Sequence, residues 1–279
     1  MGENMDIIEI IKDAFVFPSN DMKTLLIYVI LSIVASIFAV MGSVVYILGF
    51  VTPECFMWGG IGVVISMLIV WVMSGYLVSV IKSGIDLDDE VPKFVWWDNF
   101  ITGFNQFIVS IVYFIIPAFI VGVVGYVTNV YGNLMIVAQA ISSQTQSVYM
   151  GTANTVVFDA MAPVLANLVV SLTFTLTVGL VLFIIFSFLQ TMAEARLANT
   201  DSLGEALNVL EAAKDIRRIG VGKVIAVILL IMIIIGVIQM ILSAIFNYVP
   251  ILSILSLIIT PYLIFFAQRA VGLLYSDIA

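Results

Sequence analysis

Residues 224–246 decide the fold: they spell VIAVILLIMIIIGVIQMILSAIF and contain no charged side chain. A helix needs roughly 20 consecutive apolar residues to cross the hydrocarbon core of a bilayer, and this stretch is long enough. The whole chain of 279 residues has the same character, because 63% of it is hydrophobic, 10% is charged and the mean hydropathy is +1.22. Soluble domains are about half apolar and about a quarter charged. The composition therefore excludes soluble, disordered and collagen-like proteins and predicts an integral membrane protein.

The other spans follow from where charges are absent. The uncharged stretches are residues 24–53, 55–81, 99–158, 160–193 and 224–268. The last holds two spans divided at Pro250, because proline disfavours helical geometry in the residue before it. After residue 128 the sequence becomes rich in Ser, Thr and Gln, which predicts an outer loop over 129–160; a surface or re-entrant helix at 134–150 stays open. The expected fold is all-α, a single membrane domain over 1–279 with six transmembrane helices near 24–51, 57–81, 103–128, 162–192, 224–246 and 250–268.

Basic residues near the span ends set the orientation of a membrane protein. With six spans, all ten fall in the N-terminal segment, the second and fourth loops or the C-terminal tail. We therefore expect a multi-pass protein of the cell membrane with both termini in the cytoplasm. A seventh span would place several of these residues on the wrong side. The formal net charge of −8 argues against nucleic acid as a partner.

Three segments on the expected cytoplasmic side are amphipathic. They are residues 5–17, 92–102 and 202–218, and each is typical of a helix in the membrane interface or against the ends of the spans. The third opens with a capping-box spacing at Ser202 and Glu205. Each segment precedes two spans, which suggests a parallel threefold repeat over 5–82, 92–193 and 202–272; the alternative is that multi-span proteins commonly have amphipathic loops. The third segment presents an apolar face of Leu203, Leu207 and Leu210.

Short motifs also flank the second loop. Gly75-Tyr76 ends a span, an acidic loop follows, and residues 92–103 then fit P-x-F-x-x-W-x-x-F-x-x-G. With Ala193-Glu194-Ala195-Arg196, this pattern resembles an uncharacterised family of archaeal membrane proteins, catalogued as a domain of unknown function, over residues 10–270. The resemblance implies six spans and an archaeal source, and it implies no activity. The positions that it marks as determinants of the fold or of partner binding are Gly75, Pro92, Phe94, Trp97 and Gly103.

The residues that most enzymes need are scarce. The chain contains no histidine, so Ser-His-Asp and Cys-His arrangements and histidine metal sites are excluded. The span centres carry no Asp, Glu, Lys or Arg, which argues against proton relays through carboxylates. Glu194 and Arg196 are most simply a helix-end pair. We therefore expect no catalytic residues, no cofactor and no metal site, and hence no enzyme.

Uncharged polar residues remain in the spans, and most are expected to make hydrogen bonds between helices. The best candidates for a substrate path are Asn167 and Gln239, two amides away from the span ends. The acidic run at 86–90 is more typical of a solvated loop than of a calcium site, since it lacks the spacing of calcium-binding loops. The glycines at 59, 60 and 62 and at 122 and 125 are expected at close helix crossings.

These observations leave two functions in view. The first is a non-enzymatic membrane organiser, or an assembly or scaffold subunit, that binds lipids or partner proteins through the amphipathic segments, within a membrane-protein complex or a homo-oligomer. The alternative is a facilitator or channel for a neutral or lipid-like substrate, which needs no coupling charge. A lipid-modifying enzyme that uses Glu194 and Arg196 is a distant third.

Overall fold

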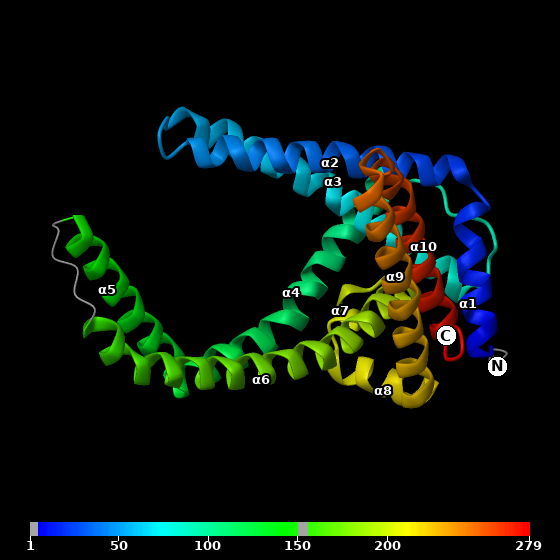
Figure 1. Cartoon of the computed structure of the whole chain (residues 1–279). Helices are drawn as coiled ribbons and strands as arrows, with labels where there is room; N and C mark the ends of the chain where they lie inside the picture. Colours follow the sequence, from blue (N-terminus) through cyan, green and yellow to red (C-terminus); the bar gives the residue numbers. More distant parts are fainter. Residues whose placement is uncertain (1–4, 150–155) are drawn as a thin grey trace. The chain divides into compact units, whose positions relative to one another are not determined.

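The computed structural model describes residues 5–149 and 156–279, with the side chains of 144–160 excepted (Figure 1). Every regular element in these ranges is a helix. The elements are α1 (Ile7–Val16), η1 (Phe17–Ser19), α2 (Met22–Leu48), α3 (Glu54–Ile85), α4 (Trp96–Val127), α5 (Val130–Tyr149), α6 (Val156–Thr200), α7 (Leu203–Ala206), α8 (Val209–Ile219), α9 (Val221–Tyr248), η2 (Pro250–Leu255) and α10 (Ser256–Tyr275).

Six helical stretches are long and apolar enough to cross a membrane, as the charge-free stretches predict. They are Met22–Leu48, Glu54–Ile85, Trp96–Val127, Met161–Thr200, Val221–Tyr248 and Pro250–Tyr275. Most of the helices extend past the predicted ends, because helical hydrogen bonding continues where apolar composition stops. Many large apolar side chains on these helices are exposed on the surface of the single chain. Such a surface is expected where a protein faces lipid.

The chain divides into two compact units. Unit 1 comprises residues 1–110 and 189–279, and unit 2 comprises residues 111–188. In unit 1, α3 packs on α2 and α10, and α1 packs on α10, so the described ends of the chain lie next to one another (Figure 1). The core of unit 1 joins η1, α2, α3 and α10; its buried residues are Phe17, Leu25, Tyr28, Ala35, Met73, Tyr76, Val80 and Phe265.

Glycines on α3 set its close contacts with three other helices. A Cβ on Gly59 would lie 2.2 Å from the backbone nitrogen of Tyr46 on α2. A Cβ on Gly75 would lie 1.7 Å from the carbonyl oxygen of Asn99 on α4, and one on Gly84 would lie 2.8 Å from the carbonyl oxygen of Arg269 on α10. Small residues let helix backbones approach in membranes, where apolar burial from water gives little driving force. Helix α3 is therefore the element around which unit 1 packs.

The opposing helices contribute glycines to the same crossings. A Cβ on Gly103 of α4 would lie 1.7 Å from the carbonyl oxygen of Trp71, and a Cβ on Gly272 of α10 would lie 2.1 Å from that of Ile81. The sequence predicts close crossings at five glycines, at positions 59, 60, 62, 122 and 125. Gly59 and Gly62 lie at a close crossing with α2. A Cβ on Gly60 or Gly122 would meet nothing within 4 Å, and the nearest atoms to a Cβ on Gly125 belong to the side chain of Tyr131.

Unit 2 contains a helix where an outer loop was expected. Residues 130–149 form α5, so this part of the predicted outer loop at 129–160 is helical and coincides with the helix at 134–150 that the sequence left open. Residues 150–155 lie outside the described ranges. Asn129 separates α4 from α5 with a φ of +58°, a conformation that Asn tolerates better than most residues. The hydroxyl of Ser142 finds its partner within the helix, because Ser142 Oγ donates to the carbonyl of Ala138 at 2.6 Å.

The three amphipathic segments take three different forms. Residues 7–16 form the separate helix α1. Pro92 and Phe94 precede α4 in non-helical backbone, and α4 then runs without a break from Trp96 into the span, which corrects the separate helix predicted at 92–102. The segment predicted over 202–218 is two helices, α7 and α8, because Asn208 caps α8 with its side chain. The threefold repeat stays a prediction.

Candidate functional site

Arg269 is the centre of the first cluster of charges in unit 1. Its side chain, on α10, is only 1% exposed. Nε donates to Asp13 Oδ1 of α1 at 3.0 Å, Nη1 to the carbonyl oxygen of Ser83 on α3 at 2.9 Å, and Nη2 to Asp89 Oδ1 at 3.2 Å. Nη1 also donates to the carbonyl oxygen of Asp88, and the guanidinium carbon lies 4.5 Å from the ring centre of Phe17. Arg269 therefore ties α1, η1, α3 and its following loop to α10.

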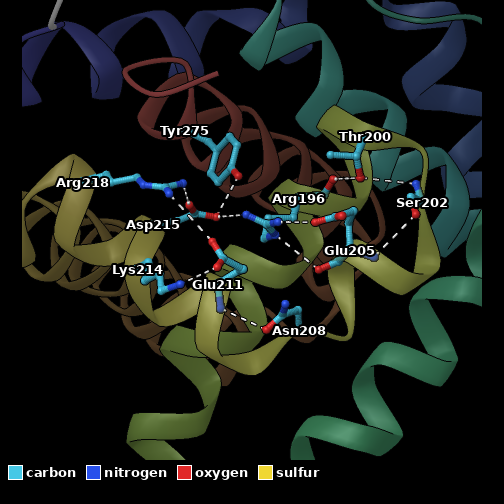
Figure 2. Close-up of polar contacts among 10 residues, drawn as sticks. All are labelled: Arg196, Thr200, Ser202, Glu205, Asn208, Glu211, Lys214, Asp215, Arg218 and Tyr275. Atoms are coloured by element: carbon cyan, nitrogen blue, oxygen red, sulfur yellow. Dashed lines mark hydrogen bonds and ion pairs between the residues drawn. The ribbon is translucent and has the colours of Figure 1, made fainter.

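Arg196 is the centre of the second cluster (Figure 2). It lies near the end of α6 and donates from Nη1 to Asp215 Oδ2 at 2.7 Å and from Nη2 to Glu205 Oε2 at 2.6 Å. Asp215 is 1% exposed and accepts two further hydrogen bonds, from Tyr275 Oη at 2.9 Å and from Arg218 Nη1 at 3.0 Å. A buried carboxylate is stable only when such partners replace water. This cluster therefore joins α6, α7, α8 and α10.

The cap of α7 differs from the predicted capping box. Ser202 Oγ accepts a hydrogen bond from the backbone N–H of Glu205 at 3.5 Å, as predicted. The Glu205 carboxylate, however, accepts from Arg196, and the backbone N–H of Ser202 donates to Thr200 Oγ1. On α8, Lys214 donates to Glu211 at 2.5 Å and thereby lowers the pKa of that carboxyl group. The predicted pair of Glu194 with Arg196 is wrong, because Arg196 is held by Asp215 and Glu205.

Every nitrogen of both guanidinium groups has a hydrogen-bond partner, so the two clusters are suited to holding helices together. Beside Arg269 lies a cleft of about 580 Å³, lined by Met5, Glu9, Asp13, Leu87, Asp89, Arg269 and Leu273. The acidic run at 86–90 contributes to this cluster through Asp88 and Asp89. In the described part of the chain, no group of three or more Cys, Asp or Glu side chains is arranged to hold a metal ion.

An apolar groove of about 450 Å³ lies elsewhere in unit 1, lined by Leu31, Leu68, Ile69, Val72, Trp96, Trp97 and Phe100. Trp97 is 70% exposed, and its ring stacks with that of Phe100 at 5.9 Å. Phe94 instead faces the core, where its ring stacks on Tyr76 at 4.0 Å. The motif therefore combines residues that pack inside (Gly75, Phe94 and Gly103) with Trp97, which is open to the surroundings.

Unit 2 has an uncharged polar pocket of about 460 Å³. Its lining is Thr128, Asn129, Asn133, Asn167, Val170, Ser171 and Phe174. The Thr128 and Thr175 hydroxyls are hydrogen-bonded at 3.1 Å beside it, joining α4 to α6. Asn167, predicted as a path residue, thus lies in a pocket. Gln239 lies exposed on α9 in unit 1 and lines none of these three cavities.

The predicted apolar face of the third amphipathic segment is divided by the break at Asn208. Leu203 and Leu207 are partly buried, whereas Leu210 is 75% exposed on α8.

Sequence reasoning missed Arg269, Asp215 and Tyr275 as site residues. For Arg269 a signal existed, because it is the one basic residue after Lys223 and follows directly on a membrane span.

One of three comparisons with known proteins identifies the family of the chain. A family model described as "Protein of unknown function (DUF4013)" matches residues 58–247, which is about two-thirds of the chain and less than the 10–270 expected from the motifs. Searches of the curated proteins and of the solved structures found no match. The matched region contains the α3–α4 crossing, the polar pocket of unit 2 and every residue of the Arg196 cluster except Tyr275, and the chain belongs to this family of unknown function.

Proposed function

We propose that the protein is a non-enzymatic organiser of the membrane: a scaffold or assembly subunit that binds lipids or partner subunits through its non-spanning helices. The observation that carries the proposal is Leu210. It is 75% exposed on α8, while Asp215 on the same helix is buried and held by Arg196 and Tyr275. An apolar side chain is thus presented on a helix that cannot turn to bury it.

The exposed face of α8 has the composition of an interfacial helix. Leu210, Lys214 and Arg217 follow one another at positions i, i+4 and i+7, so they share one face. Exposed Ile8 and Val16 give α1 a similar outer surface. Apolar and basic residues together favour the boundary between lipid headgroups and acyl chains. We propose that this end of unit 1 faces the cytoplasm, as the bias of basic residues predicts.

The test compares complexes of three proteins, each extracted gently from its own membranes and measured by native mass spectrometry. They are the wild type, Leu210→Glu, and Asn199→Glu, which adds the same charge at an exposed polar position on α6. We expect the wild type and Asn199→Glu to carry the same stoichiometric partner subunit or lipid and Leu210→Glu to lose it. An unchanged complex in Leu210→Glu, or a bare wild-type chain, contradicts the proposal.

A second candidate function, a facilitator of neutral solutes, is favoured by the pocket of unit 2. Hydroxyls and amides line it without any charge, as suits an uncharged polar solute. In proteoliposomes, Asn167→Leu should then slow glycerol entry measured by stopped-flow light scattering, whereas Gln239→Leu, outside that pocket, should not. Equal rates for the wild type, Asn167→Leu and protein-free vesicles rule this candidate out for glycerol.

A further inference from the structure

The contact between α4 and α6 within unit 1 contains a carboxyl group whose neighbours are amides. Glu194 lies on α6, inside the apolar stretch Met161–Thr200. Its Oε1 accepts a hydrogen bond from Gln190 Nε2 at 2.9 Å, and Gln106 of α4 donates a second one. Gln190 Nε2 also lies 2.9 Å from Ser110 Oγ. The carboxyl group therefore lies among uncharged polar side chains.

No cation balances Glu194 in the described residues. The nearest basic side chain along α6 is Arg196, and its guanidinium is taken by Asp215 and Glu205. Helix α4 contributes Gln106 and Ser110, neither of which carries a charge, and no charged side chain acts on the carboxyl group. A carboxylate that is partly withdrawn from water without a countercharge is costly.

The amide that holds Glu194 is itself incompletely bonded. Gln106 Oε1 is buried and has no hydrogen-bond partner within the described ranges. Because Oε1 and Nε2 belong to one planar amide, Oε1 lies next to the group that contacts Glu194. An ionised carboxylate can only accept hydrogen bonds, whereas a protonated one also donates. A proton on Glu194 would be a donor of the kind that Gln106 Oε1 lacks.

We propose that Glu194 is a proton-binding site that holds its proton at neutral pH in an acid–amide pair with Gln106. The site goes beyond the organiser role and is independent of it. Loss of the proton leaves an unbalanced charge between α4 and α6, so the pairing of these helices depends on the proton. A small monovalent cation bound by the same oxygens is the competing occupant, and the experiment separates the two.

The test is infrared spectroscopy of the reconstituted full chain, which detects the carbonyl stretch of an un-ionised carboxylic acid. At neutral pH in potassium buffer, we expect this band in the wild type and in Glu54→Gln, which changes an exposed carboxylate, and its loss in Glu194→Gln. Glu194→Asp should shift the frequency of the band, and this variant replaces Glu194→Gln as the test if Glu194→Gln does not fold.

Two results overturn the proposal. The first is a wild-type spectrum at neutral pH without a carboxylic-acid band assignable to residue 194. The second is a band that disappears when sodium replaces potassium at constant pH, because the site then takes a cation in place of a proton. A band that survives sodium and is lost only on raising the pH supports the proton site.

Discussion

Replacing Gly75 by alanine should force α3 and α4 apart. The new Cβ would lie 1.7 Å from the carbonyl oxygen of Asn99 and 2.7 Å from the backbone nitrogen of Gly103. Both obstacles are backbone atoms of a helix, so no side chain can rotate away. The two helices must separate by roughly 1.7 Å to reach an ordinary contact distance of 3.4 Å.

The size of the effect follows from that separation. A gap of about 0.5–1 Å already removes a quarter to a half of the dispersion attraction between facing atoms, and overpacking a close contact typically costs about 1–3 kcal/mol. Because the obstacle here is rigid, we expect a loss at the upper end, about 3 kcal/mol. That loss changes the folded-to-unfolded ratio by a factor on the order of 100.

The matched control is Gly236→Ala on α9, where a Cβ meets nothing within 4 Å. Alanine is the better helix former by about 0.5–1 kcal/mol, so this variant should be as stable as the wild type or slightly more so. Unfolding by sodium dodecyl sulfate in mixed micelles, followed by tryptophan fluorescence, measures both variants. Equal midpoints for Gly75→Ala and Gly236→Ala would refute the steric argument.

Two further predictions concern the polar contacts. Tyr275→Phe removes the hydroxyl that donates to buried Asp215 and should cost about 1.5–3 kcal/mol in the same unfolding assay, as is typical of hydrogen bonds to charged groups; an unchanged midpoint would show that the contact contributes nothing. The hydroxyl of Thr24 lowers the pKa of Asp21 below its ordinary value of 3.8, so the stability that ionised Asp21 adds is present above pH 3.8 and lost as the pH falls through the lowered pKa. Melting temperatures should therefore fall less in acid for Asp21→Asn than for the wild type, and parallel pH profiles would contradict this.

The six spans could be predicted from the sequence because the bilayer imposes a simple rule on length and charge. Stretches such as 55–81 cannot remain in water, and their helical form satisfies every backbone hydrogen bond in lipid. The rule fails where that constraint is absent. Residues 130–149 have mixed composition and are helical all the same, so the polar residues among them did not reveal the element.

The charged clusters were beyond sequence reasoning for a different reason. Asp13 and Arg269 lie at opposite ends of the chain and meet only because α1 packs on α10. Periodicity shows which face of a helix is apolar. It does not show which charged residue of a distant helix will pair with a charged residue on that face. Glu194 and Arg196 were paired by nearness in sequence, whereas on a helix residues two apart do not face each other.

The three glycine contacts of α3 also fix an order of events during synthesis. Gly59 contacts α2, which is synthesised before α3. The surface at Gly84 can be covered only after Gly272 of α10, near the end of the chain, has been synthesised. At about 5–20 residues per second, the ribosome needs on the order of 10–40 s to cover that interval. During this time the narrow surface at Gly84 is bare, and a chain that stalls before α10 keeps it so.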